Sequence, residues 1–279
     1  MSRTTFKLSL LMLLQFFLNH HNINGKDLKG KVKKVISKYH NSKLNTWEIS
    51  KISEFDQTGN LIKTVDYYHG EESDVSIYKY DSRGNNIELI ETYKGNIVRD
   101  RIYTYNSSNK LIKWEDFKDG SRVNLDTFIR NKSGQRVVDY YYVAEKLSLV
   151  TKYTYDKNNK ICKEESIDEF GNIKSIDSFN YIYDSKGKVL IEKRFNEFGT
   201  EIYTYENEIL REKVEDYKSS YTERYYNLNG DEESTIGRSE STSSPSFNTI
   251  TAYEYDSHGN WIKKKVTNLE PEEREIEYY

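Results

Sequence analysis

Cysteine and proline are almost absent from this sequence of 279 residues. Cys162 is the only cysteine, so no intramolecular disulfide can form, and we interpret it as a small residue on a strand. The prolines are limited to Pro245 and Pro271. Because proline removes a donor from the hydrogen-bond ladder of a sheet, this scarcity suits a chain that is mostly β-strand.

An excess of charge of one sign is also missing, since the net charge is only −3. No basic block is visible in the sequence, so we expect no nucleic-acid partner and no attraction to an anionic membrane. A polar, charged chain can remain disordered, but disordered segments are poor in aromatic residues. This chain has 14% aromatic residues, among them 25 tyrosines, which favour strands.

Motifs of enzymes and of cofactor sites are absent as well. There is no pair of His or Cys at metal-ligand spacing, no glycine-rich phosphate loop and no Gly-x-Ser-x-Gly. We therefore predict no catalytic residue, no metal, no cofactor and a protein that is not an enzyme. A pair of carboxylates for glycoside hydrolysis stays open, because distances in space cannot be read from the sequence.

The first 25 residues differ in composition from the rest. Arg3 and Lys7 precede an apolar run over residues 8–18, which is too short to span a membrane. We predict a signal peptide over residues 1–25, export to the periplasm, the cell surface or the medium, and no stable membrane span after its removal. The alternative is an uncleaved anchor or a buried first helix.

A repeat runs through residues 47–279. An aromatic-rich strand leads into Asp or Asn, and Gly or Asn follows three residues later. The first five copies begin at positions 56, 81, 106, 131 and 156, so four successive steps are each 25 residues long, and four less regular copies follow. An Asp side chain bonds the backbone of such a turn, and Gly accepts its positive φ. The turn residues singled out are Asp56, Gly59, Asp81, Gly84, Gly134, Asp156, Asp184, Gly187, Asp256 and Gly259.

Each copy is expected to be a β-hairpin. Tyr103 and Tyr105 are two residues apart, so they lie on one face of a strand. The predicted fold is all-β, with about nine antiparallel hairpins of ~25 residues forming an extended or rolled single sheet. Residues 26–46 are interpreted as an N-terminal cap and residues 232–249 as a flexible Ser/Thr-rich insertion. The recurring Asp could bind calcium, but we favour ordinary turn chemistry, because each turn offers too few oxygens.

The best copies are residues 78–85 (Tyr-Lys-Tyr-Asp-Ser-Arg-Gly-Asn) and 253–260 (Tyr-Glu-Tyr-Asp-Ser-His-Gly-Asn). They resemble the YD repeat of bacterial Rhs-type proteins and teneurins. The resemblance implies hairpin repeats, an envelope or extracellular setting, and contact with carbohydrate or protein. In large members the repeats wrap into a hollow shell around a toxin. This chain has too few repeats for a large shell and lacks Asp-Pro-x-Gly-Leu, so it is more similar to small stand-alone bacterial members.

Three tryptophans are the candidate ligand-binding residues. Trp47, Trp114 and Trp261 could form a platform for a sugar ring or a partner, but packing within the repeat is the alternative that we favour. We predict an exported, non-enzymatic binding protein of the bacterial cell envelope, with a carbohydrate or protein partner. The alternatives are an accessory or neutralising protein for a secreted toxin and an envelope polysaccharide hydrolase.

Overall fold

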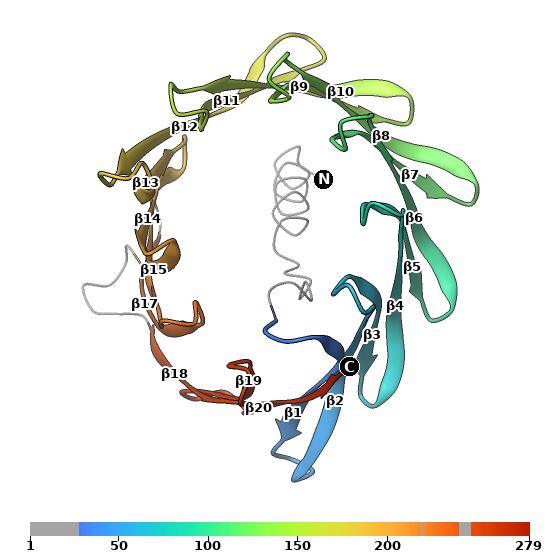
Figure 1. The fold of residues 1–279 in the computed structure, drawn as a ribbon, viewed down its shortest axis with the longest axis vertical. Helices are drawn as coiled ribbons and strands as arrows, with labels where there is room; N and C mark the ends of the chain where they lie inside the picture. Colours follow the sequence, from blue (N-terminus) through green and yellow to red (C-terminus); the bar gives the residue numbers. More distant parts are fainter. Residues whose placement is uncertain (1–27, 219, 240–246) are drawn as a thin grey trace, which may run out of the picture.

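The computed structural model describes residues 28–218, 220–239 and 247–279, which form twenty β-strands (Figure 1). The predicted signal peptide, residues 1–25, lies outside the described residues. No helix within those three ranges is long and apolar enough to cross a membrane. The first ten strands are β1 (Val32–Asn41), β2 (Thr46–Phe55), β3 (Leu61–Tyr68), β4 (Glu71–Tyr80), β5 (Asn86–Tyr93), β6 (Asn96–Tyr105), β7 (Leu111–Lys118), β8 (Ser121–Arg130), β9 (Arg136–Val143) and β10 (Lys146–Tyr155). The others are β11 (Ile161–Asp168), β12 (Ile173–Tyr183), β13 (Val189–Phe195), β14 (Gly199–Glu206), β15 (Ile209–Tyr217), β16 (Ser220–Tyr226), β17 (Glu232–Ser239), β18 (Phe247–Tyr255), β19 (Trp261–Val266) and β20 (Glu272–Tyr278).

The strands form one closed antiparallel sheet. Each strand pairs with the next along the chain, from β1–β2 to β19–β20. In addition β1 pairs with β20, where Val35 lies opposite Ile276, so the sheet is a ring (Figure 1). The prediction of an extended or rolled single sheet is therefore wrong. The C-terminal strand is not an edge, because it has neighbours on both sides.

A recurring β-bulge supplies curvature that the sequence pattern did not predict. The register shifts at or beside the last residue of every even-numbered strand from β2 to β18, as at Phe55, Tyr80 and Tyr105. The extra residue belongs to the following strand; it is Ile87 in β5 and Cys162, the single cysteine, in β11. Bulges bend a sheet and increase its twist, so bulges at one height in successive hairpins bring its two ends together.

The two ends of the ring are built from different turns. Even-numbered strands up to β18 are followed by five-residue turns, except for a two-residue turn at 207–208. Several odd-numbered strands end in two-residue turns with positive φ at both positions, such as His69-Gly70 and Asp119-Gly120. In Figure 1 the five-residue turns lie nearer the centre of the ring. We call the end formed by the turns after even-numbered strands the narrow rim, and the other end the wide rim.

The buried core lies where the ring closes. Val35 of β1 and Phe55 of β2 are each only 1% exposed, and burying such a side chain contributes about 1.5–3 kcal/mol. A polar clamp lies beside them. Asn260 Oδ1 accepts the backbone N–H of Lys29 at 2.7 Å, and Asn260 Nδ2 donates to the Lys29 carbonyl at 2.6 Å. The start of the described chain is thereby fixed to the last repeat turn.

Two segments interpreted from composition contain strands. Of the predicted cap, residues 26–46, the part from Val32 to Asn41 is β1, which lies between β20 and β2. Of the predicted insertion, residues 232–249, Glu232–Ser239 is β17 and β18 starts at Phe247. Residues 240–246 lie outside the described part.

Candidate functional site

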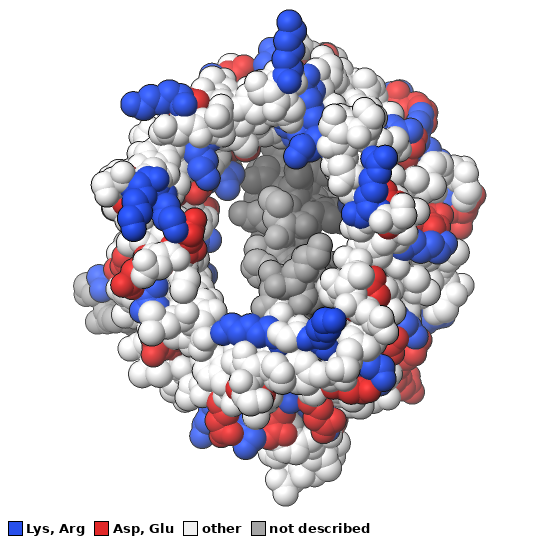
Figure 2. All heavy atoms as spheres, in the orientation of Figure 1, with Lys and Arg blue, Asp and Glu red and all other residues white. Residues whose placement is uncertain are grey.

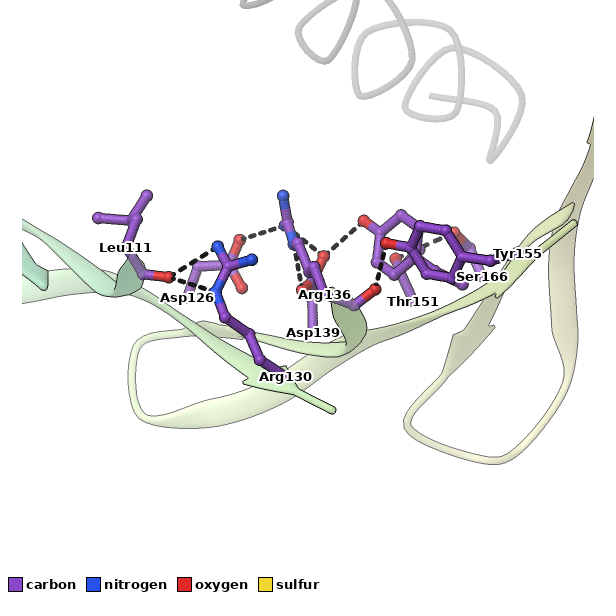
Figure 3. Close-up of polar contacts among 9 residues, drawn as sticks. Leu111, Asp126, Arg130, Arg136, Asp139, Thr151, Tyr155 and Ser166 are labelled. Atoms are coloured by element: carbon purple, nitrogen blue, oxygen red, sulfur yellow. Dashed lines mark hydrogen bonds and ion pairs between the residues drawn. The ribbon is translucent and has the colours of Figure 1, made fainter. Parts of the chain in front are cut away.

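The inner wall of the ring is lined by polar and aromatic side chains. Figure 3 shows Asp126, Asp139 and Tyr155 on the concave side of the sheet. Because side chains alternate along a strand, every second residue of each strand joins them on this wall, with the parity reset at the bulges. The Tyr-x-Tyr pairs at the ends of the even-numbered strands therefore face inward.

The last tyrosine of several even-numbered strands ties neighbouring strands together. Its hydroxyl donates to the carbonyl of the first residue of the preceding odd-numbered strand, and each such bond contributes about 1 kcal/mol. In β8, Arg130 takes the place of this tyrosine and donates to the Leu111 carbonyl at 3.0 and 3.2 Å (Figure 3). The tyrosine bonds run from Tyr80 to Leu61 at 2.8 Å, from Tyr105 to Asn86 at 2.9 Å and from Tyr155 to Arg136 at 2.7 Å.

A buried ion pair joins β6 and β7 on the inner wall. Arg101 Nε and Nη2 donate to the Asp116 carboxylate at 2.6 and 2.8 Å, and the Asp116 side chain is only 4% exposed. The Arg101 guanidinium also lies over the Trp114 ring, 4.1 Å from its centroid. The Tyr141 ring packs beside Trp114 at 5.9 Å. One face of Trp114 is therefore covered by a cation, which leaves less of it for a stacked ligand.

Two carboxylates share one arginine on the neighbouring strands. Arg136 contacts both oxygens of Asp139, and Arg136 Nη2 lies 3.9 Å from Asp126 Oδ2 (Figure 3). The Tyr153 hydroxyl donates to Asp139 Oδ2 at 2.5 Å. Asp126 Oδ1 is buried and has no hydrogen-bond partner in the described part of the chain. Asp139 is thus held by its neighbours, whereas Asp126 keeps one oxygen uncommitted.

Burial raises the pKa of Asp126 to about 7, and the neighbouring Asp139 carboxylate adds to this rise. Arg136 acts in the opposite direction. Burial, followed by the hydrogen bond to Asp139, also raises the pKa of Tyr153. Near neutral pH the Asp126 carboxyl can therefore hold or release a proton, which is the property expected of a general acid or of a proton-sensitive contact.

A similar arrangement occurs farther along the ring, around Glu201 of β14. The Tyr203 hydroxyl donates to Glu201 Oε2 at 2.5 Å, and the Tyr217 hydroxyl donates to Oε1. Burial acts to raise the pKa of Glu201, but these two hydrogen bonds lower it below its ordinary value. Lys213 pairs with Glu215 at 2.8 Å on the adjacent strand. Ion pairs and tyrosine hydroxyls thus recur along the wall.

The three predicted tryptophans are not brought together. Trp47 is 40% exposed near the wide-rim end of β2, where its ring meets His40 edge-to-face at 5.4 Å. Trp114 is on the inner wall of β7. Trp261 begins β19, and the guanidinium of Arg274 lies over it at 3.4 Å. They do not form a single platform.

The predicted turn residues all lie at the narrow rim. In each turn that begins with aspartate, Oδ1 accepts backbone N–H groups two and four residues later; at Asp56 both distances are 2.9 Å. The glycines at the fourth position have φ of 79° to 83°. Within the described ranges, no group of three or more His, Cys, Asp or Glu could hold a metal ion. The residues so placed are Asp56, Gly59, Asp81, Gly84, Gly134, Asp156, Asp184, Gly187, Asp256 and Gly259.

The charged residues of the inner wall were not predicted from the sequence. Arg101, Asp116, Asp126, Arg136 and Asp139 belong to four strands, and their pairing depends on register. The sequence did contain a signal: charged residues alternate with apolar residues along these strands. This alternation indicates that one face of the sheet is polar and the other apolar. Register across the bulges was needed to interpret it.

No protein-family model and no curated protein sequence matches the chain. Among solved structures, the TcdB2-TccC3-Cdc42 crystal structure is 10% identical with a TM-score of 0.38, covering 82% of this chain and 17% of that chain. A porin-like protein from Bacteroides uniformis is 10% identical with a TM-score of 0.36, covering 89% and 99%. One from Bacteroides vulgatus is 14% identical with a TM-score of 0.29, covering 77% and 96%. These scores assign neither family nor function, so the YD-repeat resemblance rests on the sequence motif.

Proposed function

We propose that this chain is an exported, non-enzymatic binding protein that takes its ligand, a carbohydrate or a protein segment, against the inner wall of the ring. The observation that carries the proposal is the chemistry of that wall. Small closed sheets fill their interior with side chains, whereas wide ones enclose a polar interior. A wall of tyrosine hydroxyls and ion-paired side chains suits a polar guest.

The state of the wall carboxylates supports binding over catalysis. Asp116 is held by Arg101, Asp139 by Arg136 and Tyr153, and Glu201 by two tyrosines. Carboxylates held in this way are oriented by their neighbours and stabilise the wall. A nucleophile or general base needs a lone pair directed at the substrate.

The test is a screen of the purified chain on a glycan array, followed by affinity capture with candidate proteins. A blocking variant, Ser166→Trp, adds a large ring to the inner wall, where Ser166 Oγ lies 3.2 Å from Thr151 Oγ1 (Figure 3). Its matched control is Lys163→Trp on the same strand, at an outward-facing position. We expect Ser166→Trp to weaken binding at least tenfold and Lys163→Trp to leave it unchanged. Equal effects of the two variants would place the ligand elsewhere.

One observation favours a second function, a polysaccharide hydrolase. Asp126 combines a pKa near 7, an uncommitted oxygen and a neighbouring carboxylate, which is the environment of a general acid. If the chain is a hydrolase, Asp126→Asn abolishes turnover of a glycan panel. Asp100→Asn, which lies on the outer face of β6, leaves turnover intact. Absence of turnover by the unaltered chain across the panel would remove this alternative.

Export is part of the proposal and has its own test. It is supported by the basic start and short apolar run of residues 1–25. Cell fractionation with N-terminal sequencing of the product is expected to find the chain outside the cytoplasm, with these residues removed. Recovery of the intact chain from the cytoplasm would contradict it.

A further inference from the structure

Basic side chains gather on one arc of the narrow rim. Five successive turns, from the one that follows β4 to the one that follows β12, each carry at least one exposed Lys or Arg. Figure 2 shows Lys and Arg around the central opening on the face that presents this rim. The residues of this basic arc are Arg83, Lys110, Lys132, Lys157, Lys160, Lys186 and Lys188.

Three aspartates in the same five turns offset only part of the charge of the seven basic residues. Asp81, Asp156 and Asp184 are half-buried, and their Oδ1 atoms accept backbone N–H groups at 2.8 to 2.9 Å. Each carboxylate is thus directed into its own turn, whereas the basic side chains of the arc are exposed. The exposed surface of the arc is positive, although the net charge of the chain is −3.

The basic groups of the arc have few partners within the molecule. Lys188 pairs with Glu208 at 2.6 Å. The other six residues of the basic arc form no ion pair with any residue in the described part of the chain. Exposed pairs contribute little to stability in any case, so a cluster of like charges left unpaired is not explained by folding.

The spacing and chemistry of the arc point to one class of partner. Successive turns are two strands apart, about 10 Å along the rim. We propose that the basic arc binds an acidic polysaccharide, a chain whose carboxylates or sulfates recur at about each disaccharide. Between the basic groups lie Ser and Asn side chains, such as Ser107, Ser133 and Asn158, which can hydrogen-bond sugar hydroxyls.

The same five turns disfavour two other polyanionic surfaces. They contain no aromatic residue on which a nucleic-acid base could stack, and no apolar residue that could enter a bilayer. The acidic polysaccharide is therefore the partner that matches both the charges and the polar residues between them. This proposal does not depend on a guest at the inner wall.

The experiment measures binding of the full chain to hyaluronate by titration calorimetry at low and at high NaCl. Neutral dextran, a single-stranded oligonucleotide and phosphatidylglycerol vesicles are the comparison probes. The arc variant is Lys132→Glu/Lys157→Glu/Lys186→Glu. Its matched control is Lys43→Glu/Lys118→Glu/Lys146→Glu, which makes the same change in charge at exposed positions near the wide rim.

We expect hyaluronate to bind with an affinity that falls steeply with salt, as contacts between cations and a polyanion require. The arc variant should lose at least tenfold in affinity and the wide-rim control less than twofold. No binding of hyaluronate at low salt would overturn the proposal, as would an equal loss in both variants. Tighter binding of the oligonucleotide or of the vesicles would assign the arc to a different class of partner.

Discussion

The narrow and wide rims are opposite ends of the same hairpins, yet their surfaces differ. At the narrow rim, five of the five-residue turns carry exposed basic side chains. The wide rim exposes apolar side chains at or near its turns, among them Tyr68, Phe170 and Leu269, with exposed fractions of 69%, 81% and 64%. Part of the difference follows from the turns, since a two-residue turn brings strand residues such as Tyr68 to the end of the ring, whereas Phe170 and Leu269 lie within longer turns.

Each rim also contains exceptions, which show that the type of turn does not depend on the rim. At the wide rim, Asp168 begins a five-residue turn and its Oδ1 accepts the N–H groups of Phe170 at 3.0 Å and Asn172 at 2.8 Å. At the narrow rim, Asn207-Glu208 is a two-residue turn with φ of 51° and 69°. The residues of each turn therefore decide its type, and the turn types together determine the surface of each rim.

The largest effect is expected at the wide rim, at Gly199. A Cβ there would lie 2.0 Å from the Asp216 carbonyl oxygen and 2.7 Å from Tyr217 Cα. Both are backbone atoms that cannot rotate away, so Gly199→Val should lower the free energy of unfolding by about 3 kcal/mol or more. Urea denaturation followed by circular dichroism measures it.

The control is Gly120→Ala in a two-residue turn of the same rim. A Cβ at this position would have no atom within 4 Å, but φ is +73°, so only the backbone is strained. The expected loss is about 1 kcal/mol. If both variants lose the same free energy of unfolding, the close contact with the neighbouring strand is not the reason for the glycine at position 199.

The narrow rim was the more predictable of the two. The repeat of Asp and Gly at regular spacing located its turns, because the side chain that caps such a turn is named in the sequence. Asp168 was not among the predicted turn residues. One of the four less regular copies was expected at 205–208, where the structure has a two-residue turn and the 25-residue spacing is not kept. Ring closure was missed because it depends on pairing between Val35 and Ile276 and on bulges, which leave no local signature.

The candidate surfaces were harder to predict than the turns. The basic arc is assembled from one or two residues per repeat, so the sequence contains no basic run and was interpreted as having no basic surface. The inner wall needed the register, because Arg101 meets Asp116 and not the adjacent Asp100. Trp114 was identified as a candidate, but the guanidinium above it became visible only in space.

A middle-sized effect is expected from the capping carboxylates of the narrow rim. Asp56→Ala removes the acceptor of two backbone N–H groups and should destabilise the chain by about 1–2 kcal/mol. Asp56→Asn keeps the acceptor, as Asn106 and Asn131 do in their own turns, and should cost less than about 0.5 kcal/mol. Urea titration at neutral pH measures both. Equal losses would show that charge, not the acceptor, stabilises the turn.

A smaller difference between the rims is expected in the stability that the chain loses on acidification. The Asn85 side chain and backbone lower the pKa of Asp81, and hydrogen bonds from Thr58 and Asn60 lower the pKa of Asp56 against the effect of burial. A carboxylate with a lowered folded pKa stabilises the fold above its ordinary value, about 3.9, and this contribution is lost as the pH falls through the folded pKa. The Asp56→Asn/Asp81→Asn variant should therefore lose less stability than the unaltered chain on acidification below about pH 4.

The wide-rim control for this acid series is Asp119→Asn. Asp119 lies in a two-residue turn, where no backbone N–H donates to its carboxylate in the described part of the chain. Asp119→Asn thus changes the same charge without removing a turn cap. Urea midpoints from about pH 6 to about pH 2 provide the comparison, and a flatter profile for Asp119→Asn than for the double variant would contradict the assignment of acid sensitivity to the narrow rim.

The smallest effect concerns the two-residue turns that occur at both rims. Ala144 at the wide rim and Glu208 at the narrow rim have φ of 46° and 69°, which residues with a Cβ rarely adopt. Ala144→Asn and Glu208→Gly should each stabilise the chain by a few tenths to about 1 kcal/mol, since Asn and Gly accept this conformation. Glu208→Gly also removes the exposed pair with Lys188, so its gain should be the smaller. Thermal and urea unfolding of both variants measure the gain in stability. If one variant is stabilised and the other destabilised, the rim, and not the local turn, sets the conformational preference.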